Sequence, residues 1–163
     1  MEGSSTESDN LMTEQSLKRQ IVQHCLTIIA QQIGLAEAAI KQAQLTANNE
    51  SKSSAGDKHE TARALAHLEQ ERHAQVLREN LRRQQILLKL DPTSQHHWVQ
   101  LGSLIRTNQG WFFVAISMGT IKLHGTPYRS ISLDSPLGQA LQEAELDEEI
   151  SFRNKEFVIE AIY

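Results

Sequence analysis

The sequence predicts an α+β protein in which a long antiparallel helical hairpin precedes a small β-rich domain. Three observations predict this class. A helical apolar pattern runs from Leu17 to residue 47, a polar stretch occupies residues 48–60, and short strand patterns separated by turns follow Pro92. Because the polar stretch contains nothing apolar enough for a core, the two helical segments are expected to fold back on each other there.

The first helix of the predicted hairpin has a regular seam, with apolar residues that alternate steps of three and four. These are Leu26, Ile29, Ile33, Ala36, Ile40, Ala43 and Ala47. The second helix is expected from about Lys58 to Leu90, where Asp91-Pro92 ends it. Its predicted core residues are Leu65, Leu68, Ala74, Leu77, Leu81 and Leu88. We therefore expect a coiled-coil arm over 15–92 with its tip near 56–60, and a disordered tail over 1–14.

The segment 93–163 changes to a strand-and-turn pattern. Strands are expected over 98–107, 111–117, 120–123, 128–133, 149–152 and 156–163, two of these runs being one interrupted strand. Ser135 is a good N-cap and Pro136 suits the first helical position, so one short helix should end near Gln142. The prediction is an antiparallel sheet of about five strands with one helix, shaped as a half-open barrel.

Composition limits the function classes. The 163 residues carry a net charge of −4, which argues against a general nucleic-acid binder. No apolar run approaches the ~20 residues of a membrane span, and residues 1–10 lack the pattern of a signal peptide. One cysteine, Cys25, excludes an internal disulfide and favours a reducing compartment. We expect a cytoplasmic protein with no membrane partner.

Asp57 and Glu60 are the candidate site at the tip. Asp at N-cap with Glu three residues later is a variant capping box, which would serve helix stability alone. Two carboxylates at this spacing can also share a hard cation such as Mg²⁺, with water or another molecule supplying the remaining ligands. Lys52, Lys58 and Arg63 flank the tip and could meet nucleic-acid phosphates at close range, or could simply be solvated.

Two further site types receive little support. The seven histidines and Cys25 lack the close spacing of a structural zinc site. Cys25 lies next to the helical seam and is predicted to be a small core residue, because no Cys-His-Asn arrangement for a nucleophile is visible.

The order of these features resembles the bacterial transcript-cleavage (Gre) elongation factors, which combine a helical hairpin with an FKBP-like domain. Gly56-Asp57-Lys58-His59-Glu60 is similar to that family's Gly-Asp-x-x-Glu tip. Residues 131–141, ISLDSPLGQAL, resemble its Ser-Pro segment, and residues 157–163 resemble its last strand. The chain departs from the family at Ala64, where an aromatic residue is usual, and in the Ser-rich approach to the tip. The resemblance covers roughly residues 15–163.

The resemblance implies an accessory factor and not an enzyme in its own right. Asp134, Ser135 and Pro136 would bind core RNA polymerase at its secondary channel, and Asp57 and Glu60 would help to hold a second Mg²⁺ near the 3′ end of backtracked nascent RNA. The free protein would bind Mg²⁺ weakly and would be a monomer. A secondary-channel binder that regulates the polymerase without cleavage is the alternative.

Two hypotheses from other classes stay open. A prolyl isomerase or chaperone would need an aromatic-lined cleft, which Trp98, Trp111, Phe112, Phe113 and Phe152 could supply. A plain coiled-coil adaptor would explain the hairpin without any site at its tip.

Overall fold

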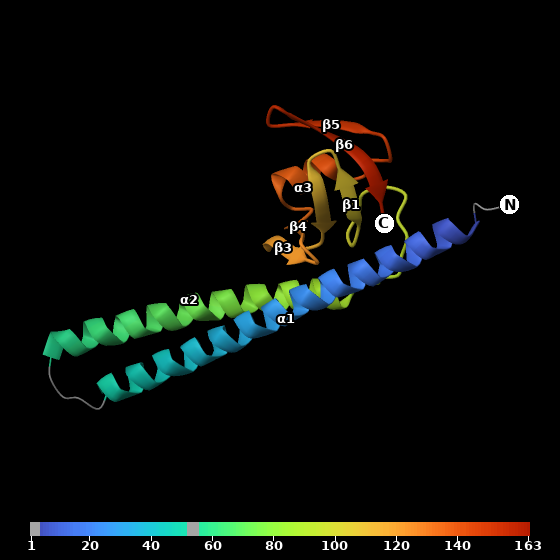
Figure 1. Cartoon of the computed structure of the whole chain (residues 1–163). Helices are drawn as coiled ribbons and strands as arrows, with labels where there is room; N and C mark the ends of the chain where they lie inside the picture. Colours follow the sequence, from blue (N-terminus) through green and yellow to red (C-terminus); the bar gives the residue numbers. More distant parts are fainter. Residues whose placement is uncertain (1–3, 52–55) are drawn as a thin grey trace. The chain divides into compact units, whose positions relative to one another are not determined.

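The computed structural model describes residues 4–51 and 56–163 and has an α+β fold (Figure 1). Two long helices, α1 (Ser4–Ser51) and α2 (Gly56–Leu88), precede six strands and one short helix. The strands are β1 (Leu104–Thr107), β2 (Gly110–Val114), β3 (Gly119–Leu123), β4 (Thr126–Ile131), β5 (Glu149–Phe152) and β6 (Lys155–Ile162). The short helix α3 (Pro136–Leu141) lies between β4 and β5 in the chain.

The chain divides into two compact units. One is Leu26–Gln85, the outer part of the hairpin, and the other combines Met1–Cys25 with Ile86–Tyr163. The predicted boundary at residue 92 therefore lies several residues later than the observed one, and the first half of α1 belongs with the β-rich part. No helix in the described ranges is both long enough and apolar enough to cross a bilayer.

Helix α1 confirms the predicted seam and extends beyond the predicted hairpin. All seven seam residues are buried or half-buried, with Ile29 and Ala36 nearly inaccessible. The helix begins at Ser4, so residues 4–14 are helical where composition predicts a disordered tail. Extending a formed helix costs far less free energy than nucleating a new one. The polar residues 4–14 can therefore continue α1 toward the N-terminus from its packed turns.

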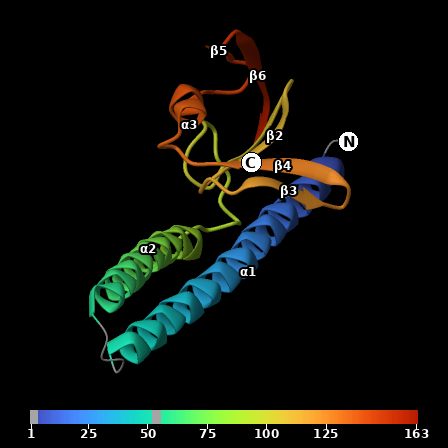
Figure 2. The same cartoon turned by 90° about the vertical axis from the view of Figure 1, so that its left-hand side faces the viewer.

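Helix α2 runs antiparallel to α1 within the unit Leu26–Gln85, as both views show (Figure 2). Its seam differs from the predicted one. Ala66 and Asn80 are buried, whereas Leu65, Leu68, Leu81 and Leu88 are between 41% and 63% exposed. Ala62, His73 and Leu77 are half-buried at the same heptad spacing. Of the predicted core residues, Ala74 and Leu77 are half-buried, so the seam of α2 is built mainly from small and polar residues, and four of the predicted leucines face solvent.

The sheet has six strands in the order β3-β4-β2-β1-β6-β5 and is mixed. The prediction of a wholly antiparallel sheet of about five strands is wrong because β2 and β4 pair in parallel, Trp111 opposite Tyr128 and Val114 opposite Ile131. After β2, the chain passes to β3 at the sheet edge and returns as β4, which inserts beside β2. Buried Ser130 fixes this return by donating a 2.5 Å hydrogen bond to the carbonyl of Ile116.

The strand predicted over 98–107 is also shorter than expected. Gly102 has a φ of +91°, which interrupts the extended backbone, so only Leu104–Thr107 enters the sheet as β1. Trp98 instead forms an isolated bridge with Glu145. The core of this part joins apolar residues from the strands, from α3 and from the loops at Val99 and Ala144: Val99, Ile105, Phe112, Val114, Leu141, Ala144, Phe157 and Ile159.

Candidate functional site

The tip carboxylates lie at the start of α2, Asp57 on its first turn and Glu60 three residues later. Asp57 and Glu60 are both exposed, and their three-residue spacing places them on one side of the helix end. Neither carboxylate forms a hydrogen bond or ion pair with another residue of the described ranges. Both are therefore available to an external cation. Carboxylate oxygens are the ligands that Mg²⁺ prefers, so the donor set fits this ion.

The predicted capping box is not formed. The helix begins at Gly56, so Asp57 lies inside the first turn, and no hydrogen bond joins Asp57 and Glu60 within the described residues. The carbonyl of Asp57 accepts a 3.2 Å hydrogen bond from Thr61 Oγ1. Gly56 has a φ of +56°, a left-handed conformation that glycine adopts without strain where the chain enters the helix. The two carboxylates still favour the helix dipole.

The basic residues near the tip are only partly described. Lys58 and Arg63 are exposed within the first two turns of α2, while the predicted Lys52 lies outside the described residues. No three His, Cys, Asp or Glu side chains of the described residues come together in a way that could hold a metal ion. A cation at the tip would therefore need further ligands from water or from a partner.

The loop before α3 is held by several hydrogen bonds. Ser135 is the N-cap, with its Oγ accepting from Gly138 N at 3.0 Å and donating to Ser132 O at 2.6 Å. Gln139 Nε2 donates to the carbonyl of Asp134 at 3.3 Å. Asp134 and Pro136 are exposed, and Ser135 is half-buried between them. The predicted N-cap and first helical residue are confirmed, and the loop presents a fixed acidic and apolar surface. This loop and the tip belong to different units of the chain.

A cluster of titratable residues that was not predicted lies between α1 and the segment after Pro92. A cavity of about 160 Å³ is lined by residues that include Glu14, Lys18, His96 and Tyr163. Lys18 is only 1% exposed, and its Nζ donates to Ser94 O at 2.9 Å. Burial lowers the pKa of Lys18 to about 8, while the Asp91 carboxylate opposes this shift. The ammonium thus ties α1 to this segment.

Two other residues that line this cavity also have shifted pKa values. Burial, followed by the charge of Lys18, lowers the pKa of His96, whose Nδ1 lies 2.7 Å from Ser103 Oγ. Burial and then a hydrogen bond to Glu14 raise the pKa of Tyr163 to about 12. The other oxygen of this carboxylate, Glu14 Oε2, is buried without a hydrogen-bond partner in the described structure. Lys18 lies three residues before buried Ile21, so its face of the helix was a signal in the sequence.

The remaining candidate residues lie mainly in the core. Cys25 is fully buried, and burial raises its pKa to about 12, which keeps the thiol protonated and confirms the predicted core role. Phe112 and Phe113 are at most 1% exposed, so they cannot line an open cleft for a peptide. Trp111 stacks on Tyr163 with ring centroids 6.0 Å apart, and Phe152 is covered by Arg153.

Comparison with known proteins adds no family assignment. No protein-family model matches the chain, and no curated protein matches it in sequence.

Proposed function

We propose, on the basis of the resemblance to the Gre factors, that this protein is an accessory transcription elongation factor. It would act on RNA polymerase through the secondary channel. The observation that carries the proposal is the position of Asp57 and Glu60, exposed together at the turn end of a helical hairpin. An enzyme with a complete site would enclose its carboxylates in a cleft. Here the two carboxylates are presented outward, as ligands donated to another molecule would be.

The number of ligands that the tip can supply determines which part of the cation site the polymerase would have to provide. Two exposed carboxylates can supply at most part of the coordination of a hard cation, so the polymerase and water would supply the rest. A second Mg²⁺ held in this way would stabilise the attacking and leaving oxygens during hydrolysis of backtracked RNA. Asp57 and Glu60 would position this charge, and Lys58 and Arg63, exposed on the following turns, would face phosphates of the RNA.

Docking would use the loop before α3. An interface gains from surfaces that are already fixed, because less conformational entropy is lost on binding. The hydrogen bonds of Ser135 hold Asp134 and Pro136 in one arrangement on the surface. We assign the polymerase contact to these three residues, and the site of action to the cytoplasm, where bacterial polymerase works.

The test is single-turnover cleavage of a backtracked elongation complex assembled with the host core polymerase. The proposal expects that the full chain shortens the RNA from its 3′ end many times faster than the polymerase alone. Binding without faster cleavage, measured by competition on the same complex, would favour a regulator that occupies the channel. If the chain neither binds nor stimulates, the transcription proposal is wrong.

A further inference from the structure

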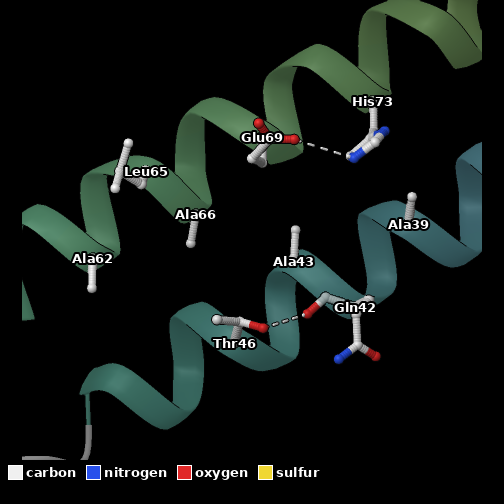
Figure 3. A pocket seen from close by; sticks show the side chains of 9 residues that line it. All are labelled: Ala39, Gln42, Ala43, Thr46, Ala62, Leu65, Ala66, Glu69 and His73. Carbon is white, nitrogen blue, oxygen red and sulfur yellow. Dashed lines mark hydrogen bonds and ion pairs between the residues drawn. The ribbon is translucent and has the colours of Figure 1, made fainter.

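One face of the unit Leu26–Gln85 carries an open groove between α1 and α2. A cavity of about 490 Å³ near the tip and a second of about 440 Å³ share Ala39 and His73, so they form one continuous hairpin groove. In the tip half, Ala43 of α1 lies opposite Ala66 of α2, with Ala62 toward the turn and Ala39 toward His73 (Figure 3). Side chains this small leave the space between the helices unfilled, whereas protein interiors are normally close-packed.

The rims of the hairpin groove carry large apolar side chains that are exposed. Leu35 is 73% exposed, Leu65 58% and Val76 46%, and all three line the groove. The groove also contains Asn80, which is 4% exposed. Large apolar side chains beside an open groove indicate a surface that another element covers.

The charges on the rim favour a second copy of the chain as that element. On α2, Glu69 precedes Val76 by seven residues, and Arg83 follows it by seven, so all three lie on one stripe. Among the residues that the structure describes, each charged residue pairs with neighbours on its own helix: Glu69 with Arg72 and His73 at 3.7 and 3.5 Å, and Arg83 with Glu79 at 3.2 Å. A twofold axis at Val76 would place Glu69 against the partner's Arg83, and Arg83 against the partner's Glu69.

The face corresponds to a small interface. Around a twofold axis at Val76, the part of α2 that can face its own copy within the groove runs from Glu69 to Arg83, roughly 21 Å at the helical rise, and two helices side by side are roughly 20 Å wide. This footprint of about 420 Å², before its ridges are counted, is about half of the ~800 Å² per partner of a standard interface and falls in the class of small, weaker contacts. The same twofold axis sets Leu35 near the partner's Leu35, because Leu35 and Val76 line the same cavity.

We propose that the hairpin groove is a homodimerisation surface on which a second copy docks antiparallel, so that the two hairpins form a four-helix bundle. The interface is isologous, with Val76 at its centre and two Glu69–Arg83 pairs across it. This differs from the monomer that the Gre resemblance implies, and it does not depend on the proposed function in transcription.

The first experiment is sedimentation equilibrium of the full chain at several concentrations. The wild type should be a dimer, and Val76→Asp should shift it to monomer. Leu68→Asp is the matched control, because Leu68 is 63% exposed on α2 but lines neither cavity. Glu69→Arg and Arg83→Glu should each weaken the dimer by about tenfold or more through like-charge contacts, and the two changes together should restore it.

A second experiment does not depend on equilibrium strength. In a Val76→Cys variant, the new thiols should oxidise readily to a disulfide-linked dimer across the twofold axis, whereas Leu68→Cys should not; Cys25 is buried and does not interfere. A wild type that sediments as a monomer at about 100 μM, far above a typical micromolar dissociation constant, would overturn the proposal. So would loss of the dimer in Leu68→Asp but not in Val76→Asp, with both variants helical by circular dichroism.

Discussion

Ser135 Oγ accepts a hydrogen bond from Gly138 N at 3.0 Å and so closes the first turn of α3. Replacing Ser135 by Ala removes this N-cap bond and the 2.6 Å bond to Ser132 O. The expected loss is about 1 kcal/mol in the free energy of unfolding. Urea denaturation should detect it, and the same change at exposed Ser151 of β5 should be nearly neutral.

Substitution of Gly138 should lower the stability of the protein more than loss of the Ser135 N-cap does. A Cβ at this position would lie 2.0 Å from Ser132 O and 2.9 Å from Leu133 Cα, both backbone atoms that cannot move independently. Gly138→Ala should therefore destabilise the protein by roughly 1–3 kcal/mol, the usual range for overpacking. Urea denaturation at pH 7 measures this. Full stability in this variant would show that the loop before α3 is less rigid than described.

The exposed residues of the same loop allow docking to be separated from folding. Asp134→Ala with Pro136→Ala should lower the affinity for core polymerase about 30-fold, which corresponds to about 2 kcal/mol at an interface charge. Stability should stay within about 0.5 kcal/mol of wild type because both side chains lie on the surface. The matched control is Glu149→Ala with Pro127→Ala, an exposed pair of the same chemistry. Unchanged affinity in a competition assay would place the docking surface elsewhere.

Lys18 predicts a pH dependence. Its pKa is about 8 in the folded chain, against an ordinary value of 10.5, because burial disfavours the charge. Between these two pH values the unfolded chain binds more protons, so this group makes stability rise with pH, by up to about 3 kcal/mol. Cys25 acts in the opposite direction from about pH 9, since burial raises its pKa to about 12.

The comparison must therefore be between variants that share Cys25. The stability of wild type minus that of Lys18→Met should increase from pH 8 to pH 10.5, as measured by urea denaturation. The groups that face Lys18, including the Asp91 carboxylate and His96, are present in both. Lys122→Met removes an exposed cation as a control. A difference that stays flat across this window would mean that Lys18 is solvated in the folded chain.

Elements that depend only on residues close in the sequence could be predicted. The seam of α1, the Ser135 cap and the pair β5 and β6 follow from spacing and turn chemistry, and all are present. The position of Asp57 and Glu60 near the start of α2 was also predicted, because it depends only on where α2 begins. The helix begins at Gly56, two residues earlier than a capping box at Asp57 requires.

Features that depend on distant partners were missed. Parallel pairing of β2 with β4 arises from the return of the chain through β3, which no local pattern specifies. The seam of α2 contains His73 and Asn80, and polar residues at such positions are invisible to a hydrophobicity count. Lys18 was missed for the same reason, since lysine is almost never fully buried without a partner.

Substitution at the tip tests the central claim most directly. Asp57→Asn with Glu60→Gln removes two charges but keeps the shape of both side chains, and a neutral amide is a much poorer ligand for Mg²⁺. Lost interaction with the helix dipole should change stability by less than about 1 kcal/mol. The charge-matched control is Glu37→Gln with Glu71→Gln, two exposed residues of the same hairpin.

The measurement is single-turnover RNA cleavage in a backtracked complex, with polymerase affinity and melting temperature recorded for each variant. We predict that the tip variant lowers the stimulated cleavage rate by orders of magnitude, while affinity and melting temperature stay near wild type and the control variant cleaves normally. Stimulated cleavage at the wild-type rate by Asp57→Asn with Glu60→Gln would contradict the account, because the two carboxylates would then serve only the end of α2.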